Sequence, residues 1–243
     1  MEDRIYGRNP VIEALTSGRE IDKVCLLDGV THSQISKITA LCKERRIPFQ
    51  FVNRKKLDEL SGGGNHQGVV AYAAAHKYSS VEDILDLARD KGEAPFILIA
   101  DGLCDPHNLG SIIRTANAAG MHGIIIPKNR SAGLSATVAK VAAGALEHML
   151  VAKVSNIAQT IEKLKNEGVW VAGTDLTATD YHYNSDLKGA LAIVIGSEGE
   201  GISRLVREKC DFLVKIPMIG EIESLNASVA AGVLIYEAVR QRS

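Results

Sequence analysis

The stretch LAIVIGSEGEG at residues 191–201 joins an uninterrupted apolar run to a loop that contains three glycines. An apolar run of this kind is typical of a strand that is buried on both faces of a parallel sheet. Gly196, Gly199 and Gly201 allow a sharp turn and let backbone amides approach a ligand closely. The stretch predicts a strand of an α/β sheet with a ligand-binding loop at its carboxyl end, and the alternative is a plain strand-to-helix turn.

The chain on both sides of this stretch repeats the alternation of apolar strands and helices. Between residues 94 and 243 the pattern predicts strands at 96–100, 123–127, 151–154, 169–173, 191–195 and 212–216, and helices at 109–119, 135–143, 157–167, 203–208 and 226–240. Apolar strands separated by helices indicate a mostly parallel sheet with helices on both faces. The predicted fold class is therefore α/β.

Residues 1–76 predict a separate, small α/β domain in front of this sheet. Its pattern gives helices at 10–17 and 33–45 and strands at 23–27, 48–52 and 68–74. Ser79 and Ser80 are suited to cap an amphipathic helix with Ile84, Leu85 and Ala88 on one side. We expect residues 77–93 to be a linker between domains at 1–76 and 94–243.

The charge of the chain is nearly balanced, with a net value of −1, so charge alone does not point to a nucleic-acid partner. Residues 1–76 hold 11 Lys and Arg against 9 Asp and Glu, which is a slight basic excess. A denser basic cluster comprises Lys43, Arg45, Arg46, Arg54, Lys55 and Lys56. This cluster could meet phosphate groups, and the alternative is a solvated helix face.

Composition excludes several classes of protein. With 46% hydrophobic and 23% charged residues, the chain is typical of a globular protein. Its longest apolar stretches fall short of the roughly 20 residues that a membrane span needs, so we predict no transmembrane helix. Residues 1–4 are not followed by the apolar segment that a secretory signal contains. We therefore expect the protein to stay in the cytoplasm. The four scattered cysteines form no CxxC pair and predict incidental thiols and no metal site.

A second candidate loop follows the strand predicted at 96–100 and contains Asn108-Leu109-Gly110. Asn108 also fits the N-cap position of the next helix. Arg114 lies on a helix made otherwise of small and apolar residues, where an unpaired guanidinium would be costly to bury. We therefore expect Arg114 to face a cleft or hold an anionic partner, and a structural salt bridge is the alternative.

A third loop runs from Ile216-Pro217-Met218 to ESLNAS at residues 223–228, directly before the last helix. Ser224 and Asn226 are each suited to cap that helix. The helix is small and apolar on almost every face up to Glu237, which predicts packing all round, against the sheet and as one option against a second subunit. Burial in the core alone is the alternative.

Taken in order, these loops resemble the three signature motifs of the SpoU (TrmH) family within the SPOUT methyltransferase superfamily. Asn108-Leu109-Gly110 with Arg114 resembles the first motif, residues 193–199 with Gly201 the second, and residues 216–218 with 224–228 the third. Residues 6–11 and 13–15, with His66-Gln67-Gly68, are similar to the N-terminal substrate-binding domain of bacterial RlmB-type enzymes. The resemblance covers nearly the full length of the chain.

The resemblance implies a deep trefoil knot in the C-terminal part of the sheet and a homodimer formed through the knotted domain. It implies S-adenosylmethionine as the methyl donor, bent in the knot, and no metal. The donor would be held largely by backbone groups at Gly196, Ile216 and Leu225. The catalytic set implied at the ribose is Arg114, Asn108, Glu198, Ser224 and Asn226.

The activity implied is methyl transfer from S-adenosylmethionine to the 2'-hydroxyl of a guanosine in 23S ribosomal RNA, with RNA bound by the front domain. Arginine stays protonated in proteins, so we expect Arg114 to stabilise oxyanion charge and clamp phosphate rather than act as a general base. One alternative is a tRNA 2'-O-ribose methyltransferase of the same family. Another is a non-catalytic RNA-binding protein that uses the basic cluster, although intact Arg114, Glu198 and Asn226 argue against it. A nicotinamide oxidoreductase is disfavoured because the GxGxxG pattern is missing.

Overall fold

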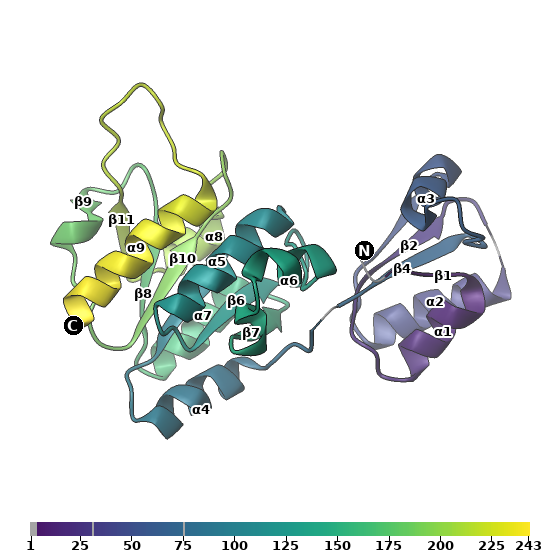
Figure 1. The fold of residues 1–243 in the computed structure, drawn as a ribbon, viewed down its shortest axis with the longest axis horizontal. Helices are drawn as coiled ribbons and strands as arrows, with labels where there is room; N and C mark the ends of the chain where they lie inside the picture. Colours follow the sequence, from purple (N-terminus) through teal and green to yellow (C-terminus); the bar gives the residue numbers. More distant parts are fainter. Residues whose placement is uncertain (1–3, 31, 75) are drawn as a thin grey trace. The chain divides into compact units, whose positions relative to one another are not determined.

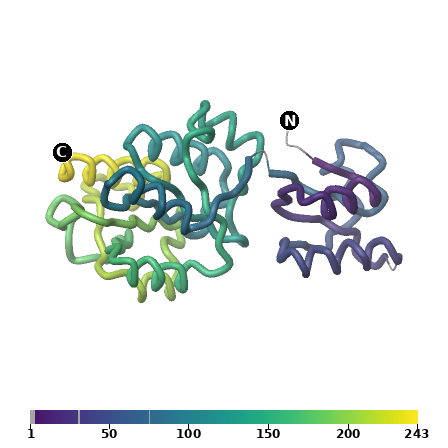
Figure 2. Tube along the Cα trace, turned by 90° about the horizontal axis from the view of Figure 1, so that it is seen from below, coloured from purple at the N-terminus to yellow at the C-terminus, as the bar shows by residue number. Residues whose placement is uncertain are grey.

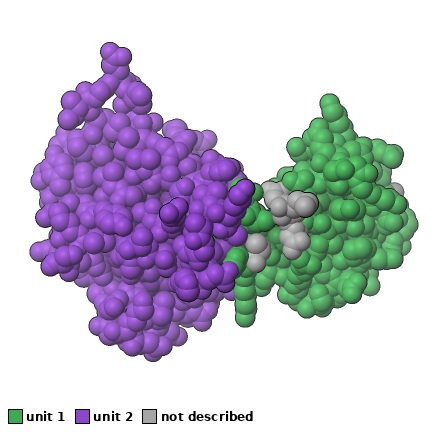
Figure 3. All heavy atoms as spheres, in the orientation of Figure 1, with its two compact units in different colours: residues 1–77, 133–137 green, residues 78–132, 138–243 purple. Residues whose placement is uncertain are grey.

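The computed structural model describes residues 4–30, 32–74 and 76–243, and within them the chain folds into two compact units (Figure 3). The first unit comprises residues 1–77 with 133–137, and the second comprises residues 78–132 with 138–243. The colours of Figure 2 show that the units are built largely from separate stretches of the chain. No helix among the described residues is long and apolar enough to cross a bilayer.

The first unit is a mixed sheet with helices on both faces. Strand β4 pairs antiparallel with β1 and β2, and β2 pairs parallel with β3, in the order β1-β4-β2-β3. Helices α1 and α2 cover one face around Val24 and Leu26, and α3 covers the other with Leu57 against Val70. The elements are β1 (Arg4–Tyr6), α1 (Arg8–Thr16), β2 (Ile21–Leu27), α2 (Ser33–Glu44), β3 (Phe49–Val52), α3 (Arg54–Ser61) and β4 (Val69–Ala73).

The basic cluster predicted in the first unit is divided by the fold. Arg45 already has hydrogen-bond partners within the unit, because its guanidinium donates to the carbonyl oxygens of Leu15 at 2.6 Å and Arg19 at 3.0 Å. The other basic run, residues 54–56, is the first turn of α3, a helix that the sequence analysis did not predict. These residues therefore belong to two structural elements, and Arg45 serves to join α1 to α2.

The second unit contains a parallel sheet in the order β7-β6-β5-β10-β8-β11-β9, which confirms the predicted α/β class. Its strands are β5 (Phe96–Ala100), β6 (Gly123–Pro127), β7 (Leu150–Val154), β8 (Trp170–Thr174), β9 (Asp180–Tyr181), β10 (Leu191–Ile195) and β11 (Phe212–Lys215). Its helices are α4 (Val81–Lys91), α5 (Pro106–Ala118), α7 (Ile157–Asn166), α8 (Arg204–Lys209) and α9 (Ala227–Arg242), with short 3-10 turns η1 (Ala145–Glu147) and η2 (His182–Asn184). Helix α6 (Ala136–Ala142) also belongs to it from residue 138 onward. Of these elements, β9 and both 3-10 turns were not predicted.

The centre of this sheet is the stretch that the sequence singled out. Every residue of β5 and β10 is buried, and β10 lies between β5 and β8. Helices α4, α7 and α8 pack on one face of the sheet, where Ile84, Ile161 and Val206 join one apolar cluster. Helices α5 and α9 pack against each other, and α9 packs on β10 (Figure 1). Apolar strands covered by helices on both faces explain why the strand runs are uninterrupted.

The segment expected as a linker, residues 77–93, contains helix α4, and from residue 78 onward it belongs to the second unit. Ser80 caps α4 by accepting from the backbone N–H of Asp83 at 3.0 Å, while the Asp83 carboxylate accepts from the backbone N–H of Ser80 at 2.7 Å. Ile84 and Leu85 are buried in the core cluster of the sheet. The second unit thus begins at residue 78, and α4 is one of its covering helices.

Helix α9 is not packed all round within one chain. Val229, Val233 and Tyr236 are 51%, 37% and 51% exposed. Their spacing of four and three residues places them on one face of the helix. The opposite side carries Leu234 and Ile235 into the core. A single chain therefore leaves an apolar stripe of α9 open to solvent.

A buried histidine lies before β6, next to the start of β5. The backbone N–H of Phe96 donates to Nδ1 of His122 at 3.0 Å, and Nε2 lies 3.1 Å from a carboxylate oxygen of Glu93. A protonated ring would point a second donor at the Phe96 N–H, so this geometry suits the neutral ring. Burial lowers the pKa of His122 below its ordinary value of 6.5, although Glu93 opposes the shift.

We expect the free energy of unfolding to fall as the pH drops below about 6.5, because unfolded His122 then takes up a proton that the folded ring resists. Urea unfolding at a series of pH values between about 7.5 and 5 measures the effect. In the His122→Gln variant this component of the pH dependence should be lost. An unchanged pH dependence in that variant would contradict the assignment.

Candidate active site

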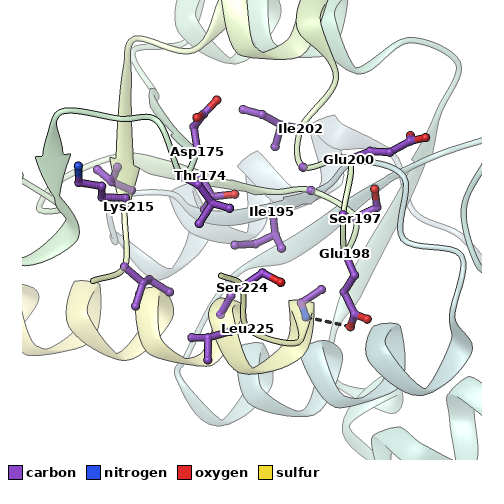
Figure 4. A pocket seen from close by; sticks show the side chains of 18 of the residues that line it. Thr174, Asp175, Ile195, Ser197, Glu198, Glu200, Ile202, Lys215, Ser224 and Leu225 are labelled. Carbon is purple, nitrogen blue, oxygen red and sulfur yellow. Dashed lines mark hydrogen bonds between the residues drawn. The ribbon is translucent and has the colours of Figure 1, made fainter. Parts of the chain in front are cut away.

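The three candidate loops meet at the carboxyl end of the parallel sheet. A pocket of about 480 Å³ is lined by the loop after β10, the end of β11, residues 223–225 before α9, and residues 174–176 after β8 (Figure 4). Its size lies within the usual range for small-molecule sites. Parallel sheets bind ligands at this edge because the loops after adjacent strands converge there.

The loop after β10 is a tight turn that closes on itself. Ser197 N–H donates to the Gly201 carbonyl at 3.1 Å, and Gly201 N–H donates to the Ser197 carbonyl at 3.0 Å. A Cβ atom on Gly196 would lie 2.0 Å from the Gly201 carbonyl carbon, so only glycine fits there. The turn is tied to β5 because Ser203 N–H donates to the Asp101 carboxylate at 2.7 Å.

Glu198 joins this turn to helices α5 and α9. Its Oε1 accepts from Asn108 Nδ2 at 3.0 Å, from Asn226 Nδ2 at 2.5 Å and from the Ala227 backbone N–H at 3.2 Å. Asn226 Nδ2 also lies 2.9 Å from Asn108 Oδ1. The Asn226 side-chain oxygen caps α9 by accepting from Ser228 N–H at 3.0 Å. The fold therefore brings together one residue from each of the three loops.

The remaining predicted site residues take different positions. Gly196, Glu198, Ile216, Ser224 and Leu225 line the pocket. Asn108 is buried behind Glu198, and Asp105 rather than Asn108 is the N-cap of α5.

Arg114 does not line the pocket, and its side chain is exposed on α5. Within residues 4–30, 32–74 and 76–243, its guanidinium makes no hydrogen bond or ion pair. The alternative of a structural salt bridge is therefore wrong for the described residues, and the expectation that Arg114 faces a cleft for an anionic ligand stays a prediction. Its charge is free to meet an anion from solution.

Asp175 and Lys215 are among the polar residues of the pocket that the sequence analysis missed. Asp175, after β8, accepts from the Thr177 N–H at 2.7 Å and pairs with Arg207 at 2.9 Å, so it orders the loop that closes one side. Lys215, at the end of β11, lines the side opposite Glu198 (Figure 4). Asp175 follows β8, a strand whose loop was not among the three candidate loops, and Lys215 is the last residue of β11, directly before the third loop.

No cysteine is among the described residues that line the pocket. Burial raises the pKa of Cys42 to about 11 and that of Cys210 to about 12, so both stay as neutral thiols. Among the described residues, no group of His, Cys, Asp and Glu is arranged to hold a metal ion.

Comparison with protein families matches two parts of the chain. Residues 95–236 match the model of the SpoU rRNA methylase family, and residues 4–79 match the model for RNA 2'-O ribose methyltransferase substrate binding. The first match covers the described pocket and every strand of the parallel sheet.

Relatives and solved structures agree with these matches. YacO of Bacillus subtilis, whose name places it among TrmH family tRNA/rRNA methyltransferases, is 52% identical over 99% of this chain and 96% of YacO. The SpoU methyltransferase AviRb of Streptomyces viridochromogenes, solved in complex with AdoMet, is 25% identical with a TM-score of 0.62 over 99% of this chain and 90% of AviRb. An AdoMet-bound rRNA methyltransferase of Sinorhizobium meliloti is 27% identical with a TM-score of 0.61 over 98% of this chain and 86% of that protein. The chain belongs to the SpoU methylase family, whose members methylate the 2'-hydroxyl of RNA ribose.

Proposed function

We propose that the chain transfers a methyl group from S-adenosylmethionine to the 2'-hydroxyl of a guanosine ribose in 23S ribosomal RNA. The observation that carries the proposal is the pocket at the carboxyl end of the sheet, where Glu198 joins Asn108 and Asn226 through hydrogen bonds. This arrangement uses one residue from each loop that resembles a SpoU motif.

The residues around the pocket fit the proposed methyl donor. Ile195, Val214 and Leu234 supply an apolar wall, and the carboxylates of Glu198 and Glu223 supply negative charge suited to a sulfonium cation. Gly196, Ile216 and Leu225 border the same space. The donor carries a methyl group that is already activated toward nucleophilic attack, so the protein mainly has to position the ribose oxygen.

Arg114 is proposed to act on the RNA rather than on the donor. It follows Asn108 by six residues, which is about 9 Å along the helix axis. A nucleotide whose ribose reaches the pocket beside Asn108 could therefore place a phosphate or the reacting oxygen near the free guanidinium. There the fixed positive charge of Arg114 would stabilise the negative charge that develops on the 2'-oxygen as its proton leaves. Ser224, at the rim, is proposed to complete the ribose site with Asn226.

The proposed RNA substrate is assigned from the N-terminal part of the chain. The match of residues 4–79 to a substrate-binding model supports an RNA-binding role for the proposed domain at 1–76. We also propose that the methyltransferase domain at 94–243 contains a trefoil knot, because its C-terminal loops resemble those of the knotted family. Large-subunit RNA is proposed over tRNA because the N-terminal residues 6–11, 13–15 and 66–68 resemble those of RlmB-type enzymes.

The open face of α9 supports a homodimer. Val229, Val233 and Tyr236 form an exposed apolar stripe, and a second copy would bury it. We propose that the dimer forms through this helix of the methyltransferase domain. Ribosomal RNA as the substrate makes the cytoplasm the proposed location.

The test is the transfer of labelled methyl from S-adenosylmethionine to purified, unmodified large-subunit rRNA and to bulk tRNA in parallel. We expect label on the rRNA alone, and mapping of the labelled nucleotide should find a 2'-O-methylguanosine. Label on tRNA alone would keep the reaction and overturn the substrate. If no RNA is labelled although rRNA binds, the protein would be an RNA-binding module instead.

A further inference from the structure

Tyr181 and Tyr183 form an aromatic column of two stacked rings at the edge of the second unit's sheet, beside the pocket. The rings of Tyr181 and Tyr183 are stacked, with centroids 5.3 Å apart and planes inclined by 10°. The ammonium of Lys215 lies 5.0 Å from the centroid of the Tyr181 ring. The register of the parallel pair β9 and β11 places Lys215 directly opposite Tyr181, so the backbone fixes this arrangement.

The column is held rigidly although its outer ring is open to solvent. His182, between the two tyrosines, is buried, and its Nδ1 lies 3.3 Å from the Lys215 carbonyl oxygen. The His182 ring also packs edge-on against Tyr183 with centroids 5.1 Å apart. Tyr183 nevertheless remains 48% exposed. A fixed, exposed aromatic ring can stack on a ligand with little loss of conformational entropy.

Lys215 connects the column to the pocket. Its side chain lines the pocket on the side opposite Glu198 (Figure 4). In the part of the chain that the structure describes, no carboxylate lies within ion-pair distance of its ammonium, and the Tyr181 ring is its close partner. A cation left without a counterion next to an exposed aromatic face matches a ligand that has both an anionic group and a flat ring. A nucleotide of single-stranded RNA has both.

We propose that Tyr183, supported by Tyr181, stacks an unpaired base of the RNA next to the nucleotide that is methylated, while Lys215 faces the phosphate between the two. The inference rests on the proposed function, because it assumes that RNA reaches the pocket. It adds a nucleotide-binding surface in the second unit to the RNA-binding role proposed for residues 1–76. Stacking is tolerant of base identity, so this surface would hold the strand in place without choosing its sequence.

The test compares Tyr183→Ala with Tyr183→Phe as the matched control. Binding of unmodified large-subunit rRNA is measured by filter binding, and KM for the RNA, kcat and the affinity for S-adenosylmethionine are measured separately. Tyr183→Ala should weaken RNA binding and raise its KM by about tenfold, the typical loss of one base stack. The affinity for S-adenosylmethionine should stay unchanged. Tyr183→Phe, which keeps the ring, should behave like the wild type.

A second variant tests the charge. Lys215→Gln should reduce the slope of the logarithm of RNA affinity against the logarithm of salt concentration by about 1, the effect of losing one phosphate contact. Tyr183→Ala should leave this slope unchanged. If the wild type methylates RNA and Tyr183→Ala binds RNA as tightly as the wild type does, this inference is wrong and the proposed function stands. A wild type that binds RNA but methylates none would instead contradict the proposed function.

The alternative to an RNA base on this surface is a second copy of the chain. Sedimentation of the wild type and of Tyr183→Ala shows which of the two binds there. If Tyr183→Ala dissociates an oligomer in parallel with its loss of RNA binding, the column is a contact between copies and the proposal is wrong. An unchanged oligomeric state together with weaker RNA binding supports it.

Discussion

Replacing Arg114 by alanine is expected to lower the rate of methyl transfer by about 10²- to 10³-fold, the usual cost of removing one group that stabilises a developing oxyanion. The affinity for S-adenosylmethionine should not change, because Arg114 does not line the pocket. Stability should change by less than about 0.5 kcal/mol, because the side chain is exposed and makes no hydrogen bond or ion pair among the described residues. Single-turnover methyl transfer, calorimetric titration with the donor, and urea unfolding measure the three quantities.

The matched control is Arg114→Lys. Lysine keeps the positive charge but cannot hold a phosphate through two parallel N–H donors, so it should recover only part of the lost rate. Retained turnover in Arg114→Ala would remove Arg114 from the catalytic set. Loss of donor binding in the same variant would show instead that the guanidinium reaches the pocket.

Arg114 also shows what neighbouring residues cannot tell about a helix face. Its neighbours Ile113 and Thr115 are apolar or small, and the sequence left open whether Arg114 faces a cleft or forms a salt bridge. On a helix, however, adjacent residues point about 100° apart, so buried neighbours do not bury the residue between them. Ile113 is fully buried while Arg114 is exposed. Residues three and four positions away are the better guide to a helix face.

The strands of the parallel sheet were the most predictable part of the fold. Strands β5 and β10 are buried on both faces, so their sequences are apolar throughout and cannot be mistaken for surface segments. Strand β9 has two residues, too few to show any periodicity. Helix α3 was missed because its first residues, Arg54 to Lys56, were assigned to a basic cluster. The cap at Asn53 and the buried Leu57 were signals for that helix.

The sequence named residues of the candidate site but not the hydrogen bonds between them. The resemblance to the SpoU family grouped Asn108, Glu198 and Asn226 in one implied catalytic set, whereas the local sequence explains each of them only as a cap or loop residue. Their hydrogen bonds span 90 and 118 positions along the chain, and no local pattern reports such contacts. Lys215 and Tyr181 are likewise brought together by strand register alone. Long-range pairing is what the structure adds.

Gly196→Ala is expected to abolish measurable binding of S-adenosylmethionine and to reduce the free energy of unfolding by about 1–3 kcal/mol, the usual cost of overpacking. The added methyl group would lie 2.0 Å from the carbonyl carbon of Gly201 and 2.2 Å from the backbone nitrogen of Ile202. Both are backbone atoms of the turn, so no side-chain rotation can relieve the clash and the turn itself must move. A displaced turn shifts Glu198 away from Asn108 and Asn226 and alters the wall of the pocket.

Gly220→Ala is the control for this variant, because it adds the same methyl group in the loop before α9. A Cβ atom there meets no atom within 4 Å, and the residue does not have a positive φ. This substitution should leave both donor affinity and stability unchanged. Titration calorimetry and urea unfolding on both variants separate a local clash from a general effect of alanine in loops. If Gly196→Ala binds the donor as well as Gly220→Ala does, the turn after β10 is not the donor site, and the pocket must serve another ligand.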